Sequence, residues 1–186
     1  MTRRFVLLDR DGTINEEVDH LAHPDQVSLI PGAAAALRDL RSAGLGLVVL
    51  TNQANVGRGL LPPERLEEIQ ARLVELLEEE GVRFDGLYVC PHALEDGCDC
   101  RKPRAGLALR ASADHGFRPA DAFVVGDHAA DMGLGRAIGA TTILVRTGHG
   151  EDELAAGAGA QADHVGADLS EAAGVILDIV LSEARR

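Results

Sequence analysis

The sequence predicts an α/β protein in which helices cover both faces of a doubly wound, mostly parallel sheet. Short apolar runs alternate with longer amphipathic stretches along the whole chain, which is typical of βαβ units. Proline opens and glycine closes several of the amphipathic stretches, as is common at helix boundaries. Polar residues directly follow three of the apolar runs, and in open parallel sheets ligand sites form at the carboxyl ends of the strands.

The first half of the chain is expected to contain two strands and two helices. The strands cover residues 5–8 and 45–50, and the helices cover residues 31–42 and 63–81. In the second helix Leu66, Ile69 and Leu73 share one face, whereas Glu and Arg cover the other. The first strand ends at Asp9, and the second runs into Thr51 and Asn52.

The second half repeats the alternation with shorter elements. We expect strands at residues 84–89, 122–125 and 141–145, and helices at about 105–115, 130–138 and 169–184. The strand at 122–125 ends at Gly126 and Asp127. Residues 155–162 are rich in Ala and Gly and are predicted to form a mobile loop.

Composition and charge narrow the class of protein. The chain has 186 residues, 46% hydrophobic and 26% charged, which suits one soluble domain spanning 1–186. The net charge of −12 argues against nonspecific binding to nucleic acid. No apolar run has the length of a signal peptide or a membrane span, so we expect a cytoplasmic protein without a membrane partner.

Polar residues with complementary chemistry are expected to converge at the carboxyl edge of the sheet. Asp9 and Asp11 offer two carboxylates to one site, although a solvated turn would also explain that segment taken alone. Thr51 and Asn52 offer a hydroxyl and an amide for phosphoryl oxygens, and Lys102 offers a positive charge. Asp127 and Asp131 add carboxylates, the ligands that Mg²⁺ prefers. Together they predict a magnesium-assisted phosphoryl-transfer site.

The three cysteines lie close together and point to a metal rather than to disulfides. Cys90, His92, Cys98 and Cys100 form a complete tetrahedral set for a structural Zn²⁺, with no position left open for catalysis. Free thiols beside a surface histidine are the alternative. Lys102 follows the last ligand closely, so a zinc-bound loop over about residues 90–103 would hold this lysine in place.

These residues resemble, in order, the four motifs of the haloacid-dehalogenase-like phosphatase superfamily, with its Rossmann-like sheet. The motifs are Asp9-Arg10-Asp11-Gly12-Thr13, Thr51-Asn52, Lys102, and Gly126-Asp127 with Asp131. The resemblance implies that Asp9 is the nucleophile and Asp11 the general acid and base. It also implies that Asp9, the Asp11 carbonyl and Asp127 bind Mg²⁺, that Thr51 and Lys102 stabilise the phosphoryl group, and that Asp131 supports them.

The cysteine-rich loop also resembles one group within this superfamily, the heptose bisphosphate phosphatases and histidinol-phosphate phosphatases. The resemblance implies a capless enzyme that removes the 7-phosphate of D-glycero-D-manno-heptose 1,7-bisphosphate. We expect this enzyme to be a monomer. Arg101 and Arg58, together with Asn52, would bind the phosphorylated sugar. Hydrolysis of histidinol phosphate is the alternative activity, and a catalytically inactive zinc-stabilised binding module is the alternative of another class.

Some positions depart from the pattern of this group. Ala54-Asn55 stands where the heptose enzymes usually have Ser-Gly, and His128 stands where Lys or Ser is common. Both positions border the expected pocket, so they bear on the substrate more than on the chemistry. The roles of His20 and His23, in the loop after Asp11, stay open.

Overall fold

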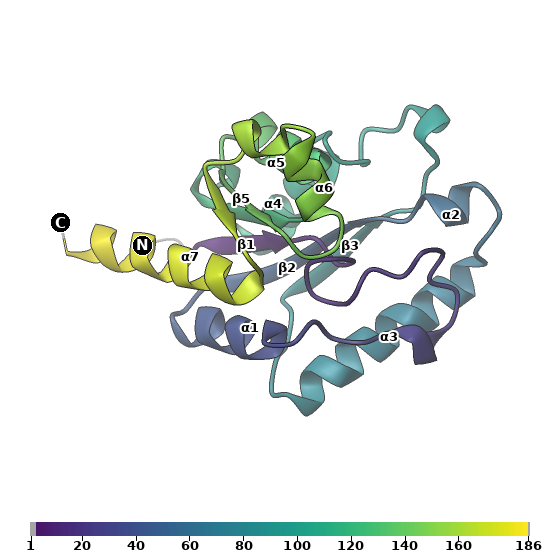
Figure 1. Ribbon diagram of the computed structural model, residues 1–186, viewed down its shortest axis with the longest axis horizontal. Coiled ribbons are helices and arrows are strands. Elements are labelled where there is room, and N and C mark those ends of the chain that lie inside the picture. The colour runs from purple at the N-terminus through teal and green to yellow at the C-terminus, as the bar shows by residue number, and fades with distance from the viewer. Residues whose placement is uncertain (1–2, 186) are drawn as a thin grey trace.

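The computed structural model describes residues 3–185, which form a six-stranded sheet with helices on both faces (Figure 1). All strand pairs are parallel, and the strand order is β3-β2-β1-β4-β5-β6. The strands are β1 (Phe5–Leu8), β2 (Gly46–Asn52), β3 (Gly86–Cys90), β4 (Phe123–Gly126), β5 (Thr141–Val145) and β6 (His164–Gly166). The predicted fold class is therefore confirmed.

The described residues form seven α-helices, five of them close to the ranges expected from the sequence. The helices are α1 (Ala33–Ser42), α2 (Ala54–Gly57), α3 (Pro63–Glu79), α4 (Gly106–His115), α5 (Ala129–Ile138), α6 (Gly150–Ala155) and α7 (Leu169–Ala184). None of the helices in residues 3–185 combines the length and the apolar character that crossing a membrane requires.

Alternating side chains of the central strand face two separate cores. Val6 and Leu8 of β1 point into a cluster built with α1, α3 and α7, whereas Phe5 and Leu7 point into a cluster built with α4 and α5. Figure 1 shows α1, α3 and α7 along one face of the sheet and α4 and α5 along the other. All four β1 side chains are buried, as expected of a strand covered on both faces.

The strand order places a crevice between β1 and β4. The chain runs from β1 outward through β2 to β3, and then returns to the other side of β1 as β4. Loops that leave β1 and β4 therefore diverge at their carboxyl ends, where open α/β sheets bind ligands. The Asp9 amide still donates to the Val125 carbonyl at 2.9 Å, so the two strand ends stay together at the crevice.

Residues 155–162, which were predicted to form a mobile loop, contain regular structure. The segment begins at the last residue of α6 and contains a 3₁₀-helix over Ala158–Gln161. Ala158 is buried against Met132 and Leu144. The Arg136 side chain also donates to the carbonyls of Ala160 and Gln161, at 3.1 and 2.8 Å. The short edge strand β6 follows this segment and was not predicted.

Candidate active site

A pocket of about 640 Å³ opens at the carboxyl edge of the sheet. The segments that follow β1 and β4, the end of β2 and the loop before α4 all contribute to its wall. The catalytic, magnesium-binding and substrate-binding residues expected from the sequence all line it: Asp9, Asp11, Thr51, Asn52, Arg58, Arg101, Lys102, Asp127 and Asp131. The fold thus brings these residues together from distant parts of the chain.

Lys102 lies at the base of this pocket between two carboxylates. Its Nζ is 2.8 Å from Asp9 Oδ1 and 2.6 Å from Asp131 Oδ1, and the side chain is only 4% exposed. Burial alone would lower the pKa of Lys102, but Asp131 and Asp9 raise it above its usual value. The two carboxylates therefore stabilise the charged form of Lys102 directly beside Asp9.

Three carboxylates converge at the crevice in a way that suits a divalent cation. One oxygen from each of Asp9, Asp127 and Asp131 lies within 4.8 Å of the others. Burial and then the Asp131 charge raise the pKa of Asp9 to about 7, although Lys102 opposes the shift. Burial and then the Asp9 charge raise the pKa of Asp127 to about 8. Buried oxygen ligands that repel one another fit Mg²⁺, which would neutralise them.

Gly12 allows the loop after β1 to fold closely over Asp127. Its φ of +73° belongs to the left-handed region, which favours glycine. A Cβ at this position would lie 2.1 Å from Asp127 Oδ2. The same carboxylate oxygen accepts a 2.8 Å hydrogen bond from the His149 amide. Backbone from two loops therefore fixes the orientation of Asp127.

Asp11 accepts hydrogen bonds on both of its carboxylate oxygens. Arg10 Nη2 donates to Oδ2 at 2.7 Å, and Asn15 Nδ2 donates to Oδ1 at 2.9 Å. Gln53 Nε2 donates to Oδ2 at 2.8 Å. Burial by itself would raise the pKa of Asp11, but the Arg10 guanidinium and these hydrogen bonds hold it below its usual value. Asp11 is thus held as a carboxylate in this arrangement.

Asn52 contacts the backbone of Lys102 rather than facing only the pocket. Its Oδ1 accepts from the Lys102 amide at 3.1 Å, and its Nδ2 donates to the Lys102 carbonyl at 3.2 Å. Both ends of the Asn52 amide are therefore used to attach the loop of Lys102 to the end of β2. This contact was not predicted from the sequence, which suggested substrate binding for Asn52.

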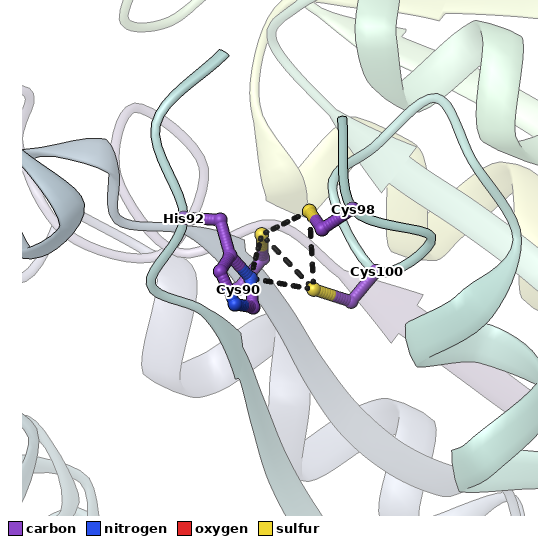
Figure 2. Close-up of side chains that lie close together, drawn as sticks. All are labelled: Cys90, His92, Cys98 and Cys100. Atoms are coloured by element: carbon purple, nitrogen blue, oxygen red, sulfur yellow. Dashed lines mark hydrogen bonds between the residues drawn. The ribbon is translucent and has the colours of Figure 1, made fainter. Parts of the chain in front are cut away.

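The Cys-His cluster lies next to the pocket, at the end of β3 (Figure 2). The sulfur of Cys100 is 3.2 Å from that of Cys90 and 3.4 Å from that of Cys98, and His92 Nδ1 is 3.1 Å from Cys100 Sγ. In a tetrahedral zinc site with Zn–S bonds of about 2.3 Å, two sulfurs lie roughly 3.8 Å apart. The side chains therefore point toward one centre at a spacing close to that of a zinc tetrahedron.

This cluster is attached by hydrogen bonds to the segments that surround the pocket. The Gln53 amide donates to the Cys90 carbonyl at 2.7 Å, and the Gly57 amide donates to the Pro91 carbonyl at 2.7 Å. On the other side, the Arg104 side chain donates to the carbonyls of Gly97 and Cys98. The cluster thus joins the loop after β2 to the loop that carries Lys102.

Charged and polar side chains form the outer wall of the pocket. Arg58 is exposed and Arg101 is half-buried, and both line the pocket. His128 Nε2 lies 2.9 Å from Glu153 Oε1, and His128 lines the pocket together with His149, His20 and Asn55. His23 is not among the described residues that line it.

Sequence reasoning missed three residues that act on Asp11: Arg10, Asn15 and Gln53. Arg10 and Asn15 lie in the same loop as Asp11 and are almost fully buried, at 1% exposure each. The place of a positive residue directly between Asp9 and Asp11 was the signal that could have drawn attention to Arg10. Gln53 stands next to the Thr51-Asn52 pair, but its contact with Asp11 depends on the tertiary structure.

Comparisons with known proteins identify the family. A family model described as "HAD-hyrolase-like" matches residues 99–172. The D-glycero-beta-D-manno-heptose-1,7-bisphosphate 7-phosphatase of Pseudomonas putida is 39% identical over 158 residues, covering 83% of this chain and 89% of its own. The D-glycero-D-manno-heptose-1,7-bisphosphate 7-phosphatase of Chlorobaculum tepidum is 37% identical over 182 residues, covering 91% of this chain and 92% of its own.

A solved structure agrees with these relatives in sequence and in fold. The D,D-heptose 1,7-bisphosphate phosphatase from B. bronchiseptica, crystallised with magnesium and phosphate, has a TM-score of 0.88 and 32% identity. The match covers 94% of this chain and 98% of that protein. The chain therefore belongs to the heptose-1,7-bisphosphate phosphatase family of haloacid-dehalogenase-like hydrolases, and it is a phosphatase.

Proposed function

We propose that this phosphatase removes the 7-phosphate of D-glycero-D-manno-heptose 1,7-bisphosphate. One observation supports this most strongly: a single pocket contains Asp9 beside Lys102 at its base and the two arginines Arg58 and Arg101 at its wall. The inner cation serves the phosphoryl group that is transferred. The outer cations suit a second phosphate on the same substrate. The relatives named above act on such a bisphosphate.

The reaction proceeds in two displacements at one phosphorus atom. The Asp9 carboxylate attacks the phosphorus, the bond from phosphorus to the sugar oxygen breaks, and Asp11 gives that oxygen its proton. Water then attacks the aspartyl-phosphate while Asp11 takes the proton of the water, and phosphate leaves with Asp9 restored. Lys102 and Thr51 stabilise the negative charge on the phosphoryl oxygens in both steps.

Asp11 has to exchange contacts between these steps. In the structure its carboxylate is bound by Arg10, Asn15 and Gln53, which suits the base of the second step. For the first step Asp11 has to carry a proton and deliver it to the sugar oxygen, so its side chain has to turn toward that oxygen. Substrate entry next to Arg10 is the event that we expect to loosen the contact between Arg10 and Asp11.

Asp9, Asp127 and the Asp11 carbonyl would hold Mg²⁺, with Asp131 close by. When bound, Mg²⁺ reduces the repulsion between the Asp9 carboxylate and the dianionic phosphate. Cys90, His92, Cys98 and Cys100 would hold a structural Zn²⁺. We also propose that the enzyme works as a monomer, since one chain supplies every residue of the pocket described here.

Steady-state kinetics on two substrates tests the proposal. With Mg²⁺ present, kcat/KM should be higher for the heptose bisphosphate than for histidinol phosphate. Asp9→Asn should abolish turnover, because the amide cannot attack phosphorus, while the thermal unfolding temperature stays close to that of the wild type. Asp19→Asn, at an exposed position of the pocket wall, is the matched control and should keep kcat.

Two results would contradict the proposal. A preference for histidinol phosphate would assign the acidic residues Glu17 and Asp19 of the pocket wall to the substrate amine. Retained turnover in Asp9→Asn would exclude the covalent route. The absence of turnover on any phosphate monoester would instead favour an inactive binding module.

A further inference from the structure

The side-chain amide of Gln53 connects two groups of the active site. Its Nε2 lies 2.8 Å from Asp11 Oδ2 and 2.9 Å from Thr51 Oγ1. Gln53 itself directly precedes the short helix α2, and its backbone amide is fixed by the Cys90 carbonyl. A single planar group therefore spans the loop after β1 and the end of β2.

The chemistry of the partners determines the direction of both hydrogen bonds. An ionised carboxylate can only accept, so the atom that faces Asp11 has to be the amide nitrogen with its two hydrogens. One hydrogen goes to Asp11. The other goes to Thr51, whose hydroxyl oxygen then serves as the acceptor.

This arrangement leaves the hydroxyl hydrogen of Thr51 free for another acceptor. A hydroxyl has one hydrogen to donate, and here its oxygen is already engaged by Gln53. Thr51 is 1% exposed and lines the pocket, so few acceptors can reach it. A phosphoryl oxygen in the pocket is an acceptor of the required kind. Gln53 thus prepares Thr51 as a donor before substrate binds, which is the condition for electrostatic preorganisation.

We propose that Gln53 is a positioning residue that sets the hydrogen-bond direction of Thr51 and, with the same amide, aligns Asp11. The inference rests on the proposed roles of Thr51 at the phosphoryl group and of Asp11 in proton transfer. Gln53 acts through these two residues rather than on the substrate itself. It couples the group that stabilises the phosphoryl oxygens to the group that moves the proton.

Gln53→Met tests the proposal, because methionine has a similar length and no hydrogen to donate. We expect kcat on the heptose bisphosphate to fall about 10- to 100-fold, as for the loss of hydrogen bonds to a charged group and to a catalytic hydroxyl. KM and the thermal unfolding temperature should change little. Gln70→Met, a half-buried position on α3 outside the pocket, is the matched control and should keep kcat.

The choice of leaving group separates a positioning role from a merely structural one. p-Nitrophenolate leaves without needing a proton, whereas a sugar alkoxide needs the proton of Asp11. The fall in kcat for Gln53→Met should therefore be smaller with p-nitrophenyl phosphate than with the heptose bisphosphate. A loss of overall structure would lower both rates by the same factor.

A double-mutant cycle examines the coupling to Thr51. In a Thr51→Val background, which has no hydroxyl to orient, Gln53→Met should have a smaller effect on kcat than it has in the wild type. The proposal would be overturned if Gln53→Met lowered kcat by the same factor in the wild-type and Thr51→Val backgrounds, and also by the same factor on p-nitrophenyl phosphate and on the heptose bisphosphate. A Gln53→Met enzyme with the kcat of the wild type would also overturn it.

A second variant keeps the test informative if Gln53→Met does not fold. In Gln53→Glu the shape is kept, but a carboxylate faces Asp11 and can only accept from Thr51, so it takes the hydroxyl hydrogen. We expect a lower kcat than in the wild type, and wild-type kcat in Gln53→Glu would overturn the inference. If the wild type itself fails to hydrolyse either substrate, the proposed function fails instead, so the two failures can be told apart.

Discussion

Lys102 illustrates how the site keeps a buried charge stable. A lone ammonium in the interior would lose its proton, but Lys102 donates to Asp9 and Asp131 at 2.8 and 2.6 Å. Because Asp131 is buried and belongs to α5, the lysine is fixed by an element other than its own loop. The position of the Asp131 side chain therefore controls the position of the charge beside Asp9.

Gly126→Ala tests this dependence at a single residue. A Cβ on Gly126 would lie 2.3 Å from Asp131 Cγ, so the added methyl group has to displace the carboxylate that holds Lys102. We expect kcat to fall about 10-fold or more. We also expect the free energy of unfolding to fall by about 1–3 kcal/mol, as in overpacked cores. Enzyme kinetics and denaturant unfolding measure the two effects.

Gly174→Ala is the matched control, since a Cβ on this α7 glycine meets no atom within 4 Å. It should keep kcat and stabilise the protein by about 0.5–1 kcal/mol, the usual gain from replacing glycine within a helix. A Gly126→Ala enzyme with unchanged kcat would show that Asp131 does not position Lys102.

The residues of the site differ in how far the sequence could predict them. Thr51 and Lys102 were predicted because each stands at a recognisable place, a strand end or the end of the cysteine loop. Asn15 and Gln53 were not, since their function comes from which side chain they contact. Asn15 contacts Asp11 four residues away, and Gln53 contacts it from forty-two residues away. Such contacts depend on the folded arrangement of two loops and leave no local pattern.

At the scale of elements, the cysteine loop is a part of the fold that a bound metal would stabilise. The loop from Cys90 to Lys102 contains only a short 3₁₀-helix over Leu94–Asp96, so little of its backbone is held by regular hydrogen bonds. Burial and then neighbouring thiols raise the pKa of Cys100 to about 12. Zinc binding has to displace such protons and would supply the stability that the loop lacks.

Cys98→Ser tests the contribution of the proposed zinc site. We expect the zinc content to fall well below that of the wild type and the free energy of unfolding to fall by about 3 kcal/mol or more, at the upper end for single substitutions, where the loss of a metal belongs. The kcat should fall as well, because Lys102 is connected to this loop. Asp99→Ser, in the same loop at an exposed position that supplies no ligand, should keep all three quantities.

Metal analysis of the purified wild type decides the outcome. About one zinc per chain is expected, and less than about half an equivalent would contradict the zinc assignment. Equal stability of Cys98→Ser and Asp99→Ser would show that the cluster does not support the loop.

The prediction of secondary-structure elements was incomplete where the sequence pattern is weak. The strands β1, β2 and β4 are continuous apolar runs and were found within one or two residues. The edge strand β6 has only three residues, His164–Gly166, of which His164 and Val165 are exposed, so it lacks both length and alternation. The 3₁₀-helix Ala158–Gln161 is stabilised by its contact with α5, which no local propensity of Ala and Gly could reveal.

At the scale of the whole molecule, repulsion between the clustered carboxylates of the site destabilises the folded protein when no metal is bound. The chain has a net charge of −12, and the fold brings the half-buried Asp9 together with the buried Asp127 and Asp131 at one edge of the sheet. The fold therefore accepts a local electrostatic cost at the place where it needs a cation. Lys102 offsets part of this cost, and Mg²⁺ would offset the rest.

The effect of Mg²⁺ on thermal stability should therefore increase with pH. Asp9 and Asp127 have pKa values of about 7 and 8, raised from 3.8, so ionising them in the folded, metal-free protein costs free energy that the unfolded chain does not incur. The contribution of these groups to stability is thus largest below about pH 4 and is lost as pH rises toward 8.

Mg²⁺ requires the ionised forms of Asp9 and Asp127 and binds more tightly as these groups lose their protons. At about 100 times Kd it should stabilise the protein by about 2.7 kcal/mol, or raise Tm by about 5–10 °C, at pH 8. The rise in Tm should be much smaller at pH 6. Thermal unfolding with and without Mg²⁺ across this range measures it, with Asp127→Asn, which removes one ligand charge, as the control that abolishes it. A rise in Tm that is equal at pH 6 and pH 8 would show that these carboxylates do not bind the metal.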